Sequence, residues 1–150
     1  MNLKKNILKE LKEAMKEGNT VKRDTLRMLD SMIKNTEIEK GKRETGLDEE
    51  EIQAIITRAI KQRKEAIMQY VSGGRDDLAQ KEKQELEILA VYQSQQLTED
   101  EIKKIVKKVI VETGATSLAD LGRVMGLSMK QLKGKADGGV VRKIVQAELK

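Results

Sequence analysis

The apolar residues of this chain recur every three or four positions along most of its length, and this spacing constrains the fold more than any other feature. Ile, Leu, Val, Met and Ala at that interval form one face of an α-helix, whereas a strand would need alternation with a period of two. The 150 residues include no Pro, Phe or Trp, and 37% of them are charged. This composition is typical of helices with aliphatic interiors. The sequence therefore predicts an all-α protein.

Capping residues and glycines divide the first two thirds of the chain into four expected helices. The clearest start is Asp48 with Glu51, a capping-box pair in which each side chain can bond a backbone N–H of the other residue. Short connections between the four helices favour an antiparallel arrangement. The expected helices are bounded by Asn2 and Gly18, by Asn19 or Thr20 and Gly41, by Asp48 and Ser72, and by about Arg75 and Tyr92.

A mostly polar, uncharged segment from Gln93 to Leu97 separates these helices from the last third of the chain. Thr98 with Glu101 forms a second capping box, and Ser117 and Asp137 can each begin a further helix. We therefore expect a four-helix domain at 1–94 and a small three-helix domain at 95–150.

The side-chain inventory excludes much enzyme chemistry. The chain has no Cys and no His, which removes thiol nucleophiles, imidazole bases and metal sites that need nitrogen or sulfur ligands. No carboxylate pair stands out as a general acid and base, so we expect no catalytic residue, metal or cofactor. The longest uninterrupted apolar run, Ile88 to Tyr92, is too short to span a bilayer. These observations predict a cytoplasmic protein without a membrane segment.

The net positive charge lies in the last third of the chain. Residues 100–150 contain eleven Lys or Arg and six Asp or Glu, whereas residues 1–99 contain nineteen of each. Within this third, residues 121–141 hold five of the eleven glycines among closely spaced cations. This combination of charge and glycine sets the last third apart from the rest of the chain, whose charge is balanced.

The stretch from Lys133 to Gly139 permits two interpretations. Glycines at the first two positions of the last helix leave N–H groups unshielded at a partly positive helix end, where a phosphate could bind beside Lys133 and Lys135. Alternatively, Gly134 supplies a positive φ in a tight helix–helix corner and Asp137 is an ordinary cap. The predicted phosphate-binding residues are Arg123, Lys130, Lys133, Lys135, Gly138 and Gly139.

Arg123 is equally open to two interpretations. Gly122 and Gly126 flank it and could permit close approach of a nucleic-acid backbone, with Arg123 on a phosphate. Otherwise Arg123 is a solvated partner of Asp120, and the two glycines allow a neighbouring helix to pack. Four further cations are better explained as the solvated face of an amphipathic helix, although they could also widen a positive surface. They are Lys103, Lys104, Lys107 and Lys108.

Several short motifs occur in a characteristic order along the chain. They include Leu26-Arg27-Met28-Leu29, Lys61-Gln62-Arg63-Lys64-Glu65, Gly74-Arg75-Asp76-Asp77-Leu78, Gly122-Arg123-Val124-Met125-Gly126 and Lys133-Gly134-Lys135-Ala136-Asp137-Gly138. This order resembles the YqeY-like family over essentially the whole chain. That family is similar to the tail of the B subunit of the glutamine-dependent aspartyl/glutamyl-tRNA amidotransferase.

The resemblance implies an all-α protein with a helical N-terminal domain and a three-helix C-terminal domain. In the amidotransferase the tail contacts tRNA, while glutamine hydrolysis and amide transfer belong to other parts of the enzyme. A label as a carbon-nitrogen ligase with glutamine as amido-N-donor would thus be inherited from that relative. This chain departs from the family by lacking Pro after Tyr92 and between Met129 and Lys130. Without the second Pro, the sixth helix can run more continuously.

Three hypotheses follow for the function. The leading one is a module that binds tRNA or another structured RNA, mainly through its shape and backbone. The second is an accessory of glutamine-dependent amidation of aminoacyl-tRNA, active only with partner subunits of the amidotransferase or aminoacyl-tRNA machinery. The third is a protein-interaction adaptor that uses the N-terminal helices, whose charge is balanced.

Overall fold

The computed structural model describes residues 2–149, and within that range it consists of helices and connecting turns without a strand. The predicted all-α class is confirmed. The chain divides into two compact units, Met1–Gln93 and Ser94–Lys150, one residue before the boundary expected from the sequence. The first unit contains α1 (Leu3–Glu17), α2 (Thr20–Glu39), α3 (Glu49–Ser72) and α4 (Asp76–Ala90). The second contains α5 (Glu99–Thr113), the 3-10 helix η1 (Leu118–Asp120), α6 (Leu121–Leu132) and α7 (Gly138–Glu148).

The helix ends follow the capping chemistry of the sequence closely. Asn2 and Asn19 cap α1 and α2, and the capping box of Asp48 and Glu51 is fully formed at the start of α3. Gly18 ends α1 with a left-handed φ of 71°, a conformation that costs a residue with a Cβ about 1–2 kcal/mol. The fourth helix ends at Ala90, two residues before the expected end, because the backbone tightens there and the Tyr92 N–H donates to the carbonyl of Leu89.

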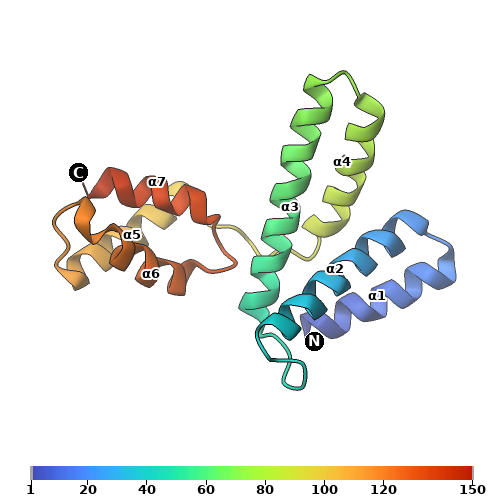
Figure 1. Cartoon of the computed structure of the whole chain (residues 1–150), viewed down its shortest axis with the longest axis horizontal. Helices are drawn as coiled ribbons and strands as arrows, with labels where there is room; N and C mark the ends of the chain where they lie inside the picture. Colours follow the sequence, from blue (N-terminus) through green and yellow to red (C-terminus); the bar gives the residue numbers. More distant parts are fainter. Residues whose placement is uncertain (1, 150) are drawn as a thin grey trace. The chain divides into compact units, whose positions relative to one another are not determined.

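The first unit is built from two helical hairpins, α1 with α2 and α3 with α4 (Figure 1). Its core is aliphatic apart from Tyr92, as the composition predicts, and the buried positions follow the expected helical stripes. The Tyr92 hydroxyl donates a hydrogen bond to Glu10 on α1. Burial raises the pKa of Tyr92, and the hydrogen bond to Glu10 raises it further. The most completely buried large side chains are Ile7, Leu26, Leu29, Ile33, Ile52, Ile56 and Leu89.

A buried carboxylate holds the connection between α2 and α3. Glu51 accepts hydrogen bonds from the Nζ atoms of Lys42 and Lys40 at 2.8 and 3.1 Å, and it accepts a third from the Asp48 N–H at 3.0 Å. The bond from Lys42 and the bond from the Asp48 backbone lower the pKa of Glu51 from 4.5 to about 2. One side chain thus caps α3 and ties down the loop that precedes it.

The second unit packs α5, α6 and α7 around its own aliphatic core. Thr98 and Glu101 form the expected capping box on α5, and Gly114 ends that helix with a φ of 68°. The sixth helix starts later than expected, because Ser117 begins η1 and the α-helix follows only from Leu121. The buried core includes Ile102, Val106, Val109, Val124, Leu132, Val141 and Val145.

Candidate nucleic-acid interface

The corner between α6 and α7 is a tightly bonded structure. Gly134 is buried with a φ of 78°, and its carbonyl accepts hydrogen bonds from Ser94 Oγ at 3.0 Å and Gln96 Nε2 at 3.1 Å. The Leu97 N–H also donates to the carbonyl of Lys135 at 2.9 Å. The segment before α5 therefore fixes the corner, and Gly134 supplies the left-handed φ that the turn requires.

The start of α7 matches the interpretation of residues 133–139 as a tight helix–helix corner. The Asp137 side chain accepts from the Val140 N–H at 3.4 Å, as an ordinary N-cap does. A Cβ placed on Gly138 would lie 4.0 Å from the terminal methyl of Met129, so this glycine faces the end of α6. Gly138 and Gly139 still carry first-turn N–H groups without a partner one turn earlier in the helix. Their anion-binding role stays a prediction.

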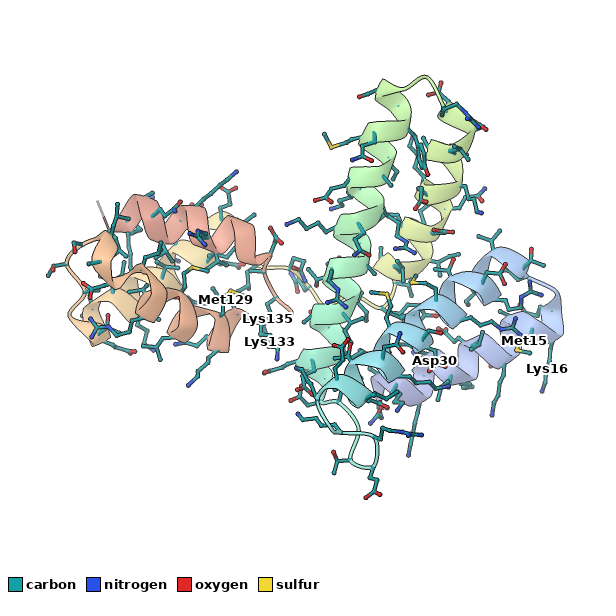
Figure 2. All side chains as sticks on the ribbon, in the orientation of Figure 1. Met15, Lys16, Asp30, Met129, Lys133 and Lys135 are labelled. Carbon is teal, nitrogen blue, oxygen red and sulfur yellow. The ribbon has the colours of Figure 1, made fainter. Side chains whose placement is uncertain are left out.

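The lysines of the corner differ in exposure. Lys133 forms the C-cap of α6 and is half-buried, whereas Lys135 is exposed, and Figure 2 places both beside Met129 at the end of α6. Lys130 is exposed in the last turn of α6. The structure thus brings Lys130, Lys133 and Lys135 to one end of the second unit.

Gly122 and Gly126 lie on the exposed face of α6. A Cβ built on Gly122 or Gly126 would meet nothing within 4 Å, apart from the helix's own backbone and the chain neighbours of each glycine. The two glycines therefore do not serve to admit another helix of the second unit. Gly126 lies in the interior of α6, where glycine costs about 1 kcal/mol relative to alanine. Packing within the second unit does not explain this choice of residue.

Arg123 and Lys130 share this outer face with the glycines. Residues seven apart lie almost exactly two turns apart on a helix, so Arg123 and Lys130 project from one side about 10 Å from each other. Arg123 forms an ion pair with Asp120 at 3.2 Å, and 54% of its side chain is exposed. An exposed pair of this kind is weak, and a phosphate can compete for the guanidinium.

The lysines of α5 form a solvated face, the more conservative of the two interpretations. All four are exposed, Lys103 pairs with Glu148 at 3.6 Å, and Lys108 lies 4.0 Å from Glu112. Among the residues that the structure describes, no group of three or more His, Cys, Asp or Glu is placed to hold a metal ion.

Sequence reasoning missed the part that Ser94 and Gln96 play in the corner. We interpreted these residues only as a polar connector, although their side chains bond the carbonyl of Gly134 forty and thirty-eight residues later. A run of short polar side chains before a capping box is compatible with both roles. Only the fold shows which backbone group they reach.

The sequence pattern of the YqeY-like proteins matches residues 4–149 of this chain. The chain belongs to the YqeY-like family. The sixth helix runs without interruption through Met129 and Lys130, as expected for a helix without a proline at that step.

Similar proteins of yeasts are named altered inheritance of mitochondria protein 41, mitochondrial. The protein from Vanderwaltozyma polyspora is 28% identical and aligns with 95% of this YqeY-like chain and 79% of its own length. The one from Kluyveromyces lactis is 29% identical, with coverages of 94% and 78%. The one from Candida glabrata reaches 38% identity over 56% of this chain. The aligned part spans less than half of that relative, 46% of its length.

These names contradict the expected cytoplasmic location. That prediction was wrong in its reasoning, because the lack of a long apolar segment does not distinguish the cytoplasm from the interior of an organelle. In the part of the YqeY-like chain that the structure describes, no helix combines the length and the apolar character needed to cross a bilayer.

Proposed function

We propose that the second unit binds structured RNA, with tRNA as the leading candidate, through the outer face of α6. The observation that carries the proposal is the open space around Gly122 and Gly126. Glycine at an exposed helix position lowers stability, and an external partner that comes close to the helix backbone is a reason to keep it there.

A sugar–phosphate backbone fits this surface by charge as well as by shape. The glycines lie one turn apart, so together they leave a shallow, side-chain-free strip along α6. Arg123 and Lys130 lie along one side of the strip and supply two cationic donors for phosphate oxygens. The unit from 94 to 150 contains eleven Lys or Arg against seven Asp or Glu, which favours association with a polyanion.

The corner after α6 extends the proposed surface. Lys133 and Lys135 follow directly, and the first-turn N–H groups of Gly138 and Gly139 lie at the partly positive end of α7. The hydrogen bonds to the Gly134 carbonyl hold the corner in place before a ligand arrives, so binding need not order a flexible loop. Recognition of this kind reads the RNA backbone and shape rather than base sequence.

The test is binding of the full chain to bulk tRNA at two salt concentrations that differ fourfold. With about four phosphates contacted, the slope of log affinity against log salt is roughly −3, and affinity falls on the order of 60-fold. The Arg123→Glu, Lys130→Glu variant should lose most of this affinity. The control is Lys104→Glu, Lys107→Glu, which makes the same charge change on the exposed face of α5.

Comparison of the two double variants distinguishes RNA binding through the α6 face from non-specific attraction by the net positive charge. Equal losses in the two double variants would mean that only net charge matters, and the α6 face would be excluded as the site. A third variant, Lys133→Glu with Lys135→Glu, measures how much the corner contributes to tRNA affinity. Because the yeast relatives are named as mitochondrial proteins, mitochondrial tRNA should be compared with bulk tRNA.

A further inference from the structure

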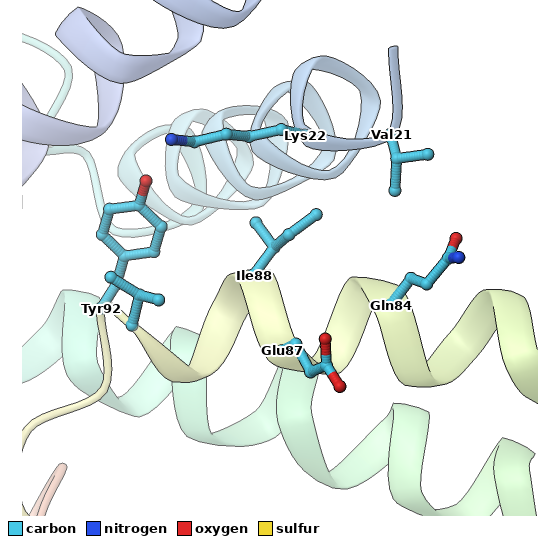
Figure 3. A pocket seen from close by; sticks show the side chains of 7 residues that line it. Val21, Lys22, Gln84, Glu87, Ile88 and Tyr92 are labelled. Atoms are coloured by element: carbon cyan, nitrogen blue, oxygen red, sulfur yellow. The ribbon is translucent and has the colours of Figure 1, made fainter. Parts of the chain in front are cut away.

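A groove lies in the first unit between the start of α2 and the end of α4. Its volume is about 440 Å³, and its walls include Val21, Lys22, Gln84, Glu87, Ile88 and Val91, with Tyr92 at one end. Figure 3 shows Ile88 and Gln84 pointing from α4 toward α2, with Lys22 along the opposite wall. Nothing in the proposed function uses these residues.

The groove exposes branched apolar side chains. Val91 is 76% exposed and Val21 is 39% exposed, and Ile88 is only half-buried. Each of these side chains would release bound water if a partner covered it, at about 25 cal/mol for each Å² buried. Tyr92 is fixed at its end of the groove by its bond to Glu10.

The polar residues of the groove carry opposite charges. Lys22 on α2 and Glu87 on α4 form no ion pair within the described chain, residues 2–149. Gln84 can donate and accept hydrogen bonds at once, so it can pair with a second glutamine amide. A partner complementary to this groove would present an anion opposite Lys22, a cation opposite Glu87, an amide opposite Gln84 and apolar side chains.

We propose that the groove binds the same groove of a second copy of this chain, forming a two-fold symmetric dimer. Two-fold symmetry places one surface against itself, so Lys22 of each copy meets Glu87 of the other. Residues 1–93 contain nineteen Lys or Arg and eighteen Asp or Glu, so two first units approach without net repulsion. The more positive second unit would oppose self-association through its own surface.

Charge reversal tests the pairing with little effect on folding. Lys22 lies in the first turn of α2 and Glu87 in the last turn of α4, so Lys22→Glu and Glu87→Lys each place a charge that the helix dipole favours. Each reversal alone puts like charges together at two symmetric positions, and we expect dimer dissociation constants to rise about tenfold. Lys5→Glu is the control, because it makes the same change at the equivalent position of α1.

Mixing the two variants gives the decisive measurement. In the mixed dimer, Glu at position 22 of one chain meets Lys at position 87 of the other, while the second pair is the native Lys22 with Glu87. Sedimentation equilibrium over a dilution series should show that each single variant needs about ten times the concentration of the native chain to reach the same average mass above the 16.9 kDa of one chain. The equimolar mixture should associate nearly as well as the native chain. The Lys5→Glu chain should associate like the native chain.

Three results would overturn the proposal. The native chain could stay at the mass of one chain at every concentration, the single reversals could leave association unchanged, or the mixture could fail to associate. The assay contains no RNA, so its outcome is independent of the proposed RNA binding. Circular dichroism of each variant checks that the helices are intact.

Discussion

Replacement of Gly126 by alanine should make the protein more stable and a weaker RNA binder at the same time. The position lies inside α6, and a Cβ there would meet nothing within 4 Å beyond the helix itself. The substitution should therefore recover the full difference in helix propensity, about 1 kcal/mol. For a domain of this size, that gain corresponds to a rise in Tm of about 4–8 °C.

The expected cost to binding comes from the added methyl group. It would hold a phosphate away from the α6 backbone and weaken about one charge-assisted contact, worth roughly 1.5 kcal/mol. The Kd for tRNA should then rise about tenfold. Thermal unfolding followed by circular dichroism gives the Tm, and fluorescence anisotropy with labelled tRNA gives the Kd. Gln131→Ala, at an exposed position of α6 away from the glycines, should leave the affinity unchanged.

Two results would refute the reasoning behind this prediction. A Gly126→Ala protein with a higher Tm and an unchanged Kd would show that the open glycine face is not where RNA approaches. A protein with a lower Tm would show that the space at Gly126 is not open in solution. The opposite signs of the two effects matter, because general damage to the fold would lower stability and binding together.

Three further predictions concern stability. Glu51→Gln should lower the free energy of unfolding by about 1–2 kcal/mol at neutral pH. The pKa of Glu51 is about 2 in the folded chain against an ordinary 4.5, so the native chain should lose this contribution as the pH falls from about 5 toward 2, whereas the variant should not. Urea titrations at pH 7 and pH 3 would show the difference. Gly134→Ala should destabilise the second unit by about 1–2 kcal/mol, since its φ of 78° disfavours a Cβ, and thermal unfolding would contradict this if the Tm were unchanged. Ile56→Ala and Val106→Ala each truncate a fully buried side chain, one in the core of each unit. Amide hydrogen exchange should therefore show loss of protection mainly in the unit that carries the substitution. Equal loss of protection in both units would contradict two separate cores.

Much of the fold could be predicted because its signals are local. Helical spacing, the capping boxes at Asp48 and Thr98, and glycines such as Gly18 and Gly114 act within one or two turns of chain, so their meaning does not depend on the rest of the molecule. The helix start at Leu121 was harder to predict, because the η1 turn before it uses the same cap residue as an α-helix would.

The candidate site could be predicted only in part. The residue types and their order indicated the region from Arg123 to Gly139, yet the same residues were compatible with both a packing corner and a phosphate site. The structure assigns Gly134 and Asp137 to the corner, and it leaves Gly122 and Gly126 in open space. The groove between α2 and α4 was not predicted, because its walls come from segments more than sixty residues apart.

The sequence by itself determined the helical class, the aliphatic cores, most helix ends and the concentration of positive charge in the last third. These properties follow from short-range spacing, capping and composition. Only the tertiary structure decided which carbonyl Ser94 and Gln96 bond, which glycines lack a neighbour, and which apolar residues stay exposed beside Lys22 and Glu87. Such facts depend on what lies across space from a residue, and contacts between distant segments are fixed by packing rather than by local preference.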